Sequence, residues 1–534
     1  MSKLLWNSPI DLESLLYELV GWESETLSEG EKNFSIKLHE KMSHLPYFSE
    51  HADYLTLDPI DKGRSFLTAL YKHEHASDTV VLISHFDTVE TEEYGQLQPI
   101  CRKPLQLTEA LKLNKDRLSK NAVKDLESGE YVFGRGTMDM KIGLAIHMGL
   151  IEKAIAEEWP INLLLVTVPD EEVNSSGMRA AVKKLVNLSE EHGLVYQLFL
   201  NSESSFSQNP EDENYYIYTG TIGKIMPSAL FYGKETHVGE PLKGMTANYI
   251  AAYFNQQMEW NPLFQEEHLG EKTPLPVSLQ QKDLKLSYST QTPARAQALY
   301  NVFMMQRSAK DIMDRFEQIA KDAVARCNEN YRALCKQENI QGIGDVRVLR
   351  FEQLESYARD KFGDSFVDAI HSKALQMDEL DERDQSFFVA DQLMHNCQEL
   401  APAVILLFTP PYYPAVNSSD DPLIQKAVQL LSEMTEQMNI PLKPVNYFNG
   451  ICDLSYVNYT DQNDGWTSYE KNTPIWGDGY FIPFEDMKKL RAPVLNVGAF
   501  GKDAHQLSER LHKESAFVRT PVLVEKLILG LFGS

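Results

Sequence analysis

Short apolar runs alternate with amphipathic stretches in this chain, and that alternation most restricts the folds open to it. Residues 79–86 (TVVLISHF), 162–168 (NLLLVTV) and 194–200 (LVYQLFL) are apolar runs of strand length. Stretches with helical spacing occupy 142–158 and 176–191. Apolar strands joined by crossover helices are typical of an α/β fold, so we expect a mostly parallel central sheet flanked by helices.

The alternation stops at about residue 210, where the polar segment QNPEDENYY begins, and it resumes after residue 417. Between these points we expect a long charge-rich helix over 294–337 and an apolar strand over 403–416. After 417 we expect a helix over 421–434, a strand over 492–500 and a closing helix over 520–532. A chain of 534 residues exceeds one ordinary core. The sequence therefore predicts one domain built from 1–210 and 417–534, interrupted by an inserted α+β domain over 211–416.

Charge and cysteine usage exclude several classes of partner. The formal net charge is -26 and no long basic run occurs, which argues against nucleic acid and anionic membranes. No export signal and no apolar run of about 18 residues is present, so a cytoplasmic protein is expected. The five cysteines form no C-x-x-C pair, which disfavours disulfides and thiolate zinc sites. Cys452, beside Asp453, is either a nucleophile or, more commonly for such a residue, part of the core.

Five separated segments place a metal-binding side chain at the end of an expected strand or in a loop. They are SHFD with His85 and Asp87, GRGTMDMKIG with Asp139, PDEE with Glu171 and Glu172, NSE with Glu203, and GKDAH with His505. Taken singly, the first is compatible with an ordinary strand end and the third with a solvated acidic turn. The glycine-rich segment matches neither the G-x-G-x-x-G nor the Walker pattern, which excludes a nucleotide site there.

Taken together, these segments predict a metal centre. Open α/β folds gather functional groups beyond the carboxyl ends of their strands, where all five segments are expected. Histidine and carboxylate ligands suit zinc, cobalt or manganese. Strand alternation puts His85 and Asp87 on one face, so the carboxylate can orient the imidazole.

The motifs SHFDTV, GRGTMDMKIG, PDEE, SES, GKETH-x-G-x-x-x-x-G-x-x-A-N and GKDAH-x-x-x-E resemble, in order, those of the M20 zinc peptidases and aminoacylases. This family includes carboxypeptidase G2, succinyl-diaminopimelate desuccinylase and acetylornithine deacetylase. The resemblance runs from about residue 12 to the C-terminus, and it implies a zinc-peptidase-like catalytic domain interrupted by a lid or dimerisation domain.

The resemblance also implies roles for the candidate residues. His85 and Glu203 would bind one divalent metal ion, Glu172 and His505 a second, and Asp139 would bridge both. Glu171 would be the general base, and Asp87 would support His85. A cis peptide bond would follow Asp139.

In the inserted domain, His237 resembles the histidine that stabilises the oxyanion, often across a dimer interface, although it is also compatible with an ordinary loop histidine. Asn248 resembles the amide that binds a substrate carboxylate. Arg295 and Arg307 could bind a carboxylate too, but surface charge on a helix is the preferred explanation for them.

Three features depart from the family pattern: a longer segment over 91–130, SES in place of E-P-S, and a larger insertion. Size and additions look most like the bacillus-type arginine-utilisation protein subgroup. We therefore expect a metal-dependent hydrolase of amide bonds in a small peptide or N-acyl amino acid, in arginine or other amino-acid catabolism. The alternatives are a non-catalytic metal- or amino-acid-binding protein that retains the fold, and a deacylase acting on a larger partner such as an acylated protein.

Overall fold

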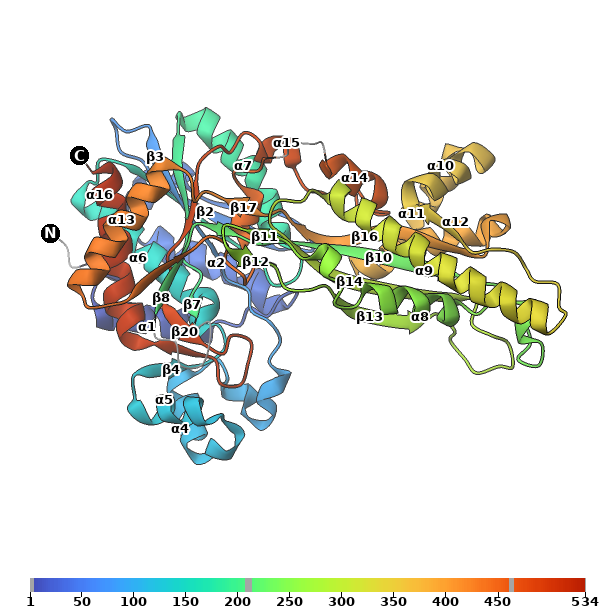
Figure 1. Ribbon diagram of the computed structural model, residues 1–534. Coiled ribbons are helices and arrows are strands. Elements are labelled where there is room, and N and C mark those ends of the chain that lie inside the picture. Colours follow the sequence, from blue (N-terminus) through green and yellow to red (C-terminus); the bar gives the residue numbers. More distant parts are fainter. Residues whose placement is uncertain (1–3, 207–213, 461–464, 534) are drawn as a thin grey trace. The chain divides into compact units, whose positions relative to one another are not determined.

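The computed structural model describes residues 4–206, 214–460 and 465–533 (Figure 1). The chain forms two compact units. Unit 1 comprises Met1–Thr221, Val416–Tyr459 and Pro483–Ser534, and unit 2 comprises Ile222–Ala415 and Thr460–Ile482. The break expected at about residue 210 lies outside the described residues. Residues Thr460–Ile482, which the sequence assigned to the second part of the catalytic domain, belong to unit 2, because helix α14 (Gly465–Asn472) packs on other elements of that unit.

Unit 1 is built on an eight-stranded sheet. In spatial order its strands are β1 (Leu55–Pro59), β2 (Ser65–Tyr71), β5 (Asn162–Val168), β3 (Asp78–His85), β6 (Val195–Asn201), β19 (Val494–Asn496), β8 (Tyr215–Tyr218) and β18 (Leu442–Val445). The central strands β5, β3, β6 and β19 run parallel, whereas the β1–β2, β2–β5 and β19–β8 pairs are antiparallel. The sheet is therefore mixed, with a parallel centre.

Helices flank this sheet (Figure 1). They include α1 (Pro9–Gly21), α2 (Glu29–Ser43), α6 (Ile142–Glu157), α7 (Ser176–His192), α13 (Pro422–Gln437) and α16 (Thr520–Phe532). Helix α6 is apolar over most of its circumference, which is typical of a helix enclosed by other elements, and most of its residues are buried. One apolar core joins α6 with side chains from α1, α16 and the sheet.

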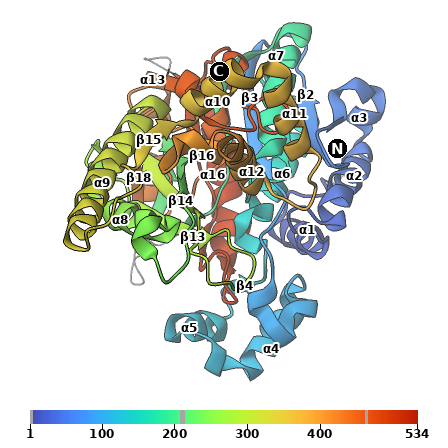
Figure 2. The same cartoon turned by 90° about the vertical axis from the view of Figure 1, so that its right-hand side faces the viewer.

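The long segment over 91–130 forms a small helical layer of its own. It contains η2 (Glu92–Ile100), α4 (Pro104–Leu113) and α5 (Lys120–Ser128), and Figures 1 and 2 show α4 and α5 set apart from the large sheet. A separate apolar cluster around Tyr94, Leu107 and Leu126 holds these helices. The chain then enters a four-stranded sheet, ordered β4 (Tyr131–Phe133), β21 (Arg510–His512), β20 (Phe500–Lys502) and β7 (Ser205–Phe206).

Unit 2 contains a five-stranded sheet with helices packed on it. Its strands, in order, are β13 (Val277–Asp283), β14 (Arg295–Met304), β10 (Gly223–Tyr232), β16 (Ala403–Tyr413) and β15 (Arg347–Arg350). Its longer helices are α8 (Ala247–Met258), α9 (Ala309–Gln337), α10 (Phe351–Phe362), α11 (Asp364–Leu375) and α12 (Glu382–Asn396).

One element of unit 2 corrects the sequence prediction. The helix expected over 294–337 begins only at Ala309, and its first third is strand β14. This strand is buried and pairs with β10 on one side and β13 on the other, so strand pairing overrides the local helical propensity. Ser308 then starts α9 with a capping box, in which its hydroxyl accepts a hydrogen bond from the backbone N–H of Asp311.

The other expected strands and helices are present, with ends shifted by a few residues, although the strand expected over 492–500 is divided between β19 and β20. All five cysteines are free and buried. Among the described residues, no helix is long and apolar enough to cross a membrane.

Candidate metal centre

The parallel centre of the large sheet brings three of the predicted segments to one edge. His85 ends β3 and pairs in register with Val168, the last residue of β5. Glu171 and Glu172 therefore follow β5 directly beside His85. Ile83 of β3 pairs with Asn201, the last residue of β6, so Glu203 emerges at the same edge. The chain direction and the strand register account for this convergence.

Asp139 reaches the same place from the glycine-rich loop that precedes α6. Gly136 has a φ of 77°, and a Cβ there would lie 2.9 Å from Cγ2 of Thr88, so the loop requires glycine at this position. The backbone of Asp139 and Met140 is not helical, with φ/ψ of -116°/102° and -122°/37°. These angles turn the chain into α6. The cis bonds found among the described residues precede Pro402 and Pro411, so the cis bond expected after Asp139 was wrong.

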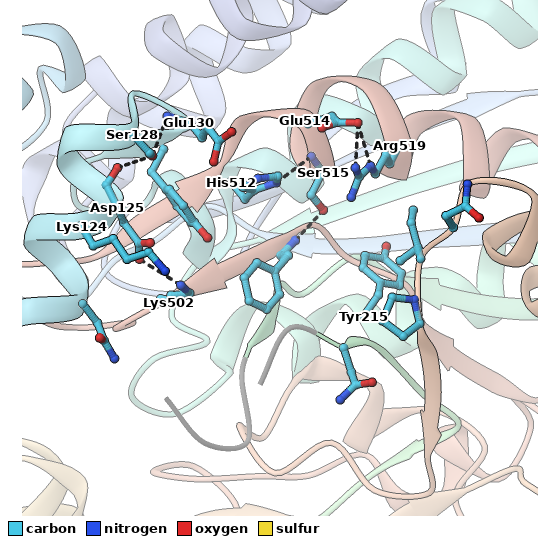
Figure 3. A pocket seen from close by; sticks show the side chains of 17 residues that line it. Lys124, Asp125, Ser128, Glu130, Tyr215, Lys502, His512, Glu514, Ser515 and Arg519 are labelled. Atoms are coloured by element: carbon cyan, nitrogen blue, oxygen red, sulfur yellow. Dashed lines mark hydrogen bonds and ion pairs between the residues drawn. The ribbon is translucent and has the colours of Figure 1, made fainter. Parts of the chain in front are cut away.

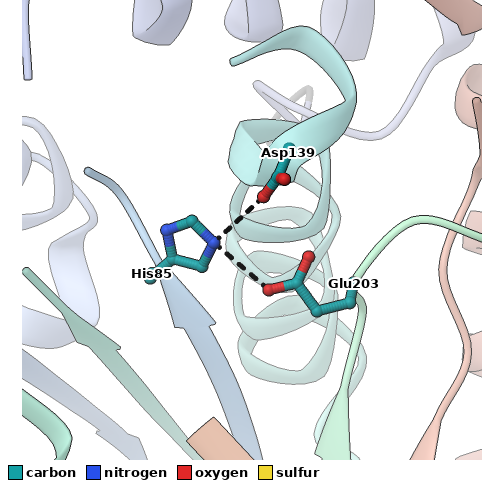
Figure 4. Close-up of side chains that lie close together, drawn as sticks. All are labelled: His85, Asp139 and Glu203. Atoms are coloured by element: carbon teal, nitrogen blue, oxygen red, sulfur yellow. Dashed lines mark hydrogen bonds and ion pairs between the residues drawn. The ribbon is translucent and has the colours of Figure 1, made fainter. Parts of the chain in front are cut away.

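The five predicted ligands meet as two groups that share one carboxylate. In the first group, Nε2 of His85 lies 3.2 Å from Oδ1 of Asp139 and 3.2 Å from Oε1 of Glu203 (Figure 4). In the second group, Nε2 of His505 lies 2.9 Å from Oδ2 of Asp139 and 3.2 Å from Oε1 of Glu172. Within each group the ligand atoms all lie within 4.8 Å of one another. This spacing accommodates a divalent cation with ligand bonds of about 2.0 to 2.2 Å.

The charges of the site also fit divalent cations. Burial raises the pKa of Glu203 to about 7 and also raises the pKa of Glu172. Although burial opposes it, hydrogen bonding to Asp139 and Glu172 raises the pKa of His505 to about 11. Although burial opposes it, hydrogen bonds from His505 and His85 hold the pKa of Asp139 well below its usual range. In the absence of metal, protons thus supply the positive charge that this carboxylate cluster requires, and divalent cations would replace them.

Asp87 connects the imidazole of His85 with the acidic turn. Its Oδ1 lies 3.3 Å from Nδ1 of His85 and accepts a hydrogen bond of 3.1 Å from the backbone N–H of Glu171. Its Oδ2 accepts from the backbone N–H of Glu172 at 3.3 Å and from the hydroxyl of Thr26 at 2.9 Å. One buried carboxylate therefore orients a histidine and two glutamates, a role that the H-x-D spacing predicted only for the histidine.

Glu171 itself lies beside His85 of the first group. Its Oε2 lies 3.9 Å from Nε2 of His85, and burial raises the pKa of this carboxyl well above its usual range. Glu171 lines a cavity of about 280 Å³ together with Asp139, Glu172, Glu203 and His505. The residue expected to act as a base thus reaches the same space as the expected metal ligands.

A loop that was not predicted from the sequence forms another wall of this cavity. Phe448, Gly450 and Ile451 line it, and the next two residues, Cys452 and Asp453, are buried. Burial raises the pKa of Asp453 to about 7 despite the attraction of His85. Burial also keeps the pKa of the Cys452 thiol far above its usual value, which favours packing over nucleophilic chemistry. Asp453, the acidic residue beside Cys452, was the feature of the sequence that could have indicated this loop.

A buried arginine supports the acidic turn from behind, and this residue was also missed. Nη1 of Arg64 lies 3.2 Å from Oδ1 of Asp170 and 3.6 Å from Oε2 of Glu31. Nη2 of Arg64 donates to the hydroxyl of Ser176 at 2.9 Å. Asp170 has a φ of 67°, a left-handed conformation that few non-glycine residues adopt. The ion pair therefore holds the turn that carries Glu171.

The remaining candidates belong to unit 2. Nδ1 of the exposed His237 accepts a hydrogen bond of 3.0 Å from the N–H of Gly239. The side-chain amide of Asn248, also exposed, donates to Asp283 at 3.1 Å. Arg295 pairs with Asp391 at 2.7 Å, and Arg307 donates to backbone carbonyls, so both arginines have structural partners. The roles of His237 and Asn248 stay predictions.

Comparison with known proteins identifies the family. The model of peptidase family M20/M25/M40 matches residues 81–464. "Uncharacterized protein YqjN" of Bacillus subtilis is 41% identical, over 98% of this chain and 97% of its own length. "Protein RocB" of the same organism is 29% identical, over 98% and 95%. A succinyl-diaminopimelate desuccinylase of Wolinella succinogenes is 26% identical over 36% of this chain and 51% of its own.

Solved structures show the same fold at low sequence identity. The M20 family metallo-carboxypeptidase Sso-CP2 of Sulfolobus solfataricus has a TM-score of 0.55 at 13% identity, covering 97% of this chain and 99% of its own. Aminopeptidase PepT of Bacillus cereus has a TM-score of 0.52 at 13% identity, covering 98% and 99%. The family and the fold class predicted from the motifs are confirmed. The chain belongs to the peptidase family M20/M25/M40 and is a member of its metallopeptidases and amidohydrolases.

Proposed function

We propose that this protein hydrolyses an amide bond in a small peptide or N-acyl amino acid with the help of two divalent metal ions. The observation that supports the proposal most strongly is the position of Asp139. Its two carboxylate oxygens lie 3.2 Å and 2.9 Å from Nε2 of His85 and His505, each of which also contacts its own glutamate. A carboxylate between two such pairs is suited to bridge two cations.

Zinc suits these nitrogen and oxygen donors best, and cobalt or manganese would also fit. Two such ions would lower the pKa of a water molecule and polarise the substrate carbonyl. The protein must then move the protons. Glu171 has the right chemistry to accept a proton from the attacking water and return it to the leaving amine. Its backbone N–H donates a hydrogen bond of 3.1 Å to Asp87, and this contact fixes the backbone position from which the Glu171 side chain extends.

The substrate is proposed to be small and to carry an amino-acid moiety. The cavity beside the candidate ligands is about 280 Å³ and has apolar surface from Phe206, Phe448 and Ile451. The resemblance to the arginine-utilisation subgroup, together with the similarity to RocB over nearly the whole chain, favours a substrate of arginine or ornithine catabolism. By the same resemblance, His237 would stabilise the oxyanion and Asn248 would bind a substrate carboxylate, in a cytoplasmic homodimer joined through the inserted domain.

The decisive experiment combines metal analysis with a substrate screen. Purified wild-type protein would be supplied with zinc, cobalt or manganese, and bound metal would be counted by mass spectrometry. Arginine-containing dipeptides and N-acetylated amino acids would then be tested for hydrolysis. We expect two ions per chain and turnover of at least one of the two classes.

Glu171→Gln is the matched control, because it removes the proposed base and leaves the five ligands unchanged. We expect this variant to keep both ions and to lose about 10²- to 10⁴-fold in kcat. Metal binding without turnover of any substrate would instead favour the non-catalytic binding protein. A protein that takes up no metal would overturn both functions, and turnover only of acylated proteins would favour the deacylase.

A further inference from the structure

The loop that carries His505 needs support from outside itself. Asp503 and His505 have φ values of 58° and 63°, so two non-glycine residues in this short loop are left-handed. The side chain of His505 is 46% exposed, whereas that of His85 is 1% exposed. Beyond its contacts with Asp139 and Glu172, burial therefore does little to fix the His505 imidazole, and the loop backbone must be held in some other way.

Arg510 ties the loop to the strand that follows it. Nη1 of Arg510 donates to Oδ2 of Asp503 and, at 3.0 Å, to the backbone carbonyl of Ser508. The hydroxyl of Ser508 also donates to Oδ2 of Asp503 at 2.7 Å. The guanidinium thus closes the loop from both ends, and Arg510 itself is buried.

The guanidinium is in turn fixed by Asp125, which lies on α5 in the long segment over 91–130. Oδ2 of Asp125 accepts a hydrogen bond of 2.8 Å from Nε of Arg510 and one of 2.9 Å from Nζ of Lys502, the residue that ends β20 just before the loop. Asp125 is nearly buried, so water screens these interactions little. One carboxylate consequently contacts both strands that flank the His505 loop.

Asp125 connects α5 with these strands through polar contacts. A cavity of about 440 Å³ opens beside them, and Asp125, Tyr131, Phe500, Lys502 and His512 line it (Figure 3). Helix α5 is also held by Leu126, which belongs to the separate apolar cluster against which Leu507 of the loop packs. Loss of the Asp125 carboxylate should therefore release Arg510 without displacing the helix.

We propose that Asp125 is a positioning residue for His505, acting through Arg510 and Asp503. The long segment over 91–130 thereby contributes to the metal centre without supplying a ligand. This inference rests on the proposed function for its consequence, since a misplaced His505 would weaken the binding of the second ion. The contacts of the loop itself do not depend on that function.

The test compares Asp125→Ala with Glu127→Ala. Glu127 lies on the same helix but forms an exposed ion pair with Lys115, so its loss removes the same charge from the same helix without touching the loop. Metal titration should show that Asp125→Ala weakens one of two ions by about 10- to 100-fold and leaves the other unchanged. Hydrogen exchange of the metal-free protein should show faster exchange over residues 503–508. Glu127→Ala should match the wild type in both measurements.

Equal weakening of both ions, or unchanged affinity together with unchanged exchange, would overturn the proposal. A wild-type protein that binds no metal would end the proposed function, but the exchange of the metal-free loop would still decide the role of Asp125. If Asp125→Ala does not fold, Asp125→Asn keeps the volume and removes the charge, and the same two measurements apply to it.

Discussion

The two ligand groups share Asp139 but are held in different ways. The large sheet positions the first group. His85 ends the central strand β3, Glu203 follows the neighbouring strand β6, and both side chains are buried. The second group depends on a loop, since His505 lies between β20 and β21 and its side chain is 46% exposed. Sheet register fixes the first histidine, and a chain of polar contacts fixes the second.

This difference predicts unequal metal sites. Preorganised ligands bind more tightly because less conformational freedom is lost on binding. The group around His85 should therefore retain its ion when the metal concentration is lowered, and the group around His505 should release its ion first. The experiments below use this contrast, beginning with the residue that both groups share.

Replacing the shared carboxylate should have the largest effect. Asp139→Ala removes a ligand from both groups and leaves two histidines facing glutamates without their common partner. We expect the metal content to fall from two ions per chain to none and hydrolysis to disappear. Mass spectrometry of the variant after metal supplementation checks this, with circular dichroism as the control for folding. Retention of one ion would mean that Asp139 serves a single group.

Replacing each histidine separately should affect metal binding and stability differently in the two groups. We expect His505→Ala to lose one ion and keep the other, because the group of His85 is complete without it. We expect His85→Ala also to lower the thermal midpoint of the metal-free protein, since it leaves buried carboxylates without their cationic partner. Metal titration and thermal unfolding of both variants measure these effects. Equal loss of stability in the two variants would contradict the difference in burial.

The support behind the acidic turn offers a smaller effect, on stability. Arg64→Met removes the guanidinium that pairs with Asp170, so the buried carboxylate loses its ion pair and keeps the hydrogen bond from the backbone N–H of Ser176. We expect the free energy of unfolding to fall by about 3 kcal/mol, as urea titration would show. Lys184→Met is the matched control, because the Lys184–Asp58 pair is partly exposed and its loss should cost less than about 1 kcal/mol. Similar losses in both variants would argue against a structural role for Arg64.

The sequence predicted the part of the site that the sheet determines. His85, Glu172 and Glu203 follow apolar runs, and parallel strands bring such positions to one edge, so local pattern and general topology were sufficient. Asp125 and Arg64 could not be predicted in this way. Their partners lie far along the chain, at Arg510 and Asp170, and only the folded structure brings them together.

Local pattern also failed where pairing decides the structure. Strand β14 reads as the start of a helix because alanine and polar residues are mixed in it, and only its two neighbouring strands reveal its conformation. Irregular loops are also hard to place from the sequence. The Phe448–Ile451 wall of the cavity carries no periodic pattern, so its approach to Glu171 was not foreseen.

The pH dependence of stability gives the smallest effect and separates the two groups once more. In the metal-free protein, burial raises the pKa of Glu203 from its usual 4.5 to about 7, so between these pH values the folded state holds a proton that the unfolded state has released. His505 has a pKa of about 11 against 6.5, so the folded state also holds its proton above pH 6.5. Both shifts make the folded state less stable as pH rises from 5 to 8. The lowered pKa of Asp139 stabilises the folded state by an amount that stays constant over this window. We expect Glu203 alone to lower the free energy of unfolding by about 2 kcal/mol over this window, with a smaller contribution from the half-exposed His505, as measured by urea titration after metal removal. Glu203→Gln should reduce the change between pH 5 and 7, to which Glu171 and Asp453 also contribute, whereas His505→Ala should reduce the change above pH 6.5. Added metal should reverse the trend, because cations compete with protons and bind more tightly as pH rises. Stability that increases with pH in the metal-free protein would show that the carboxylates are charged before any cation arrives.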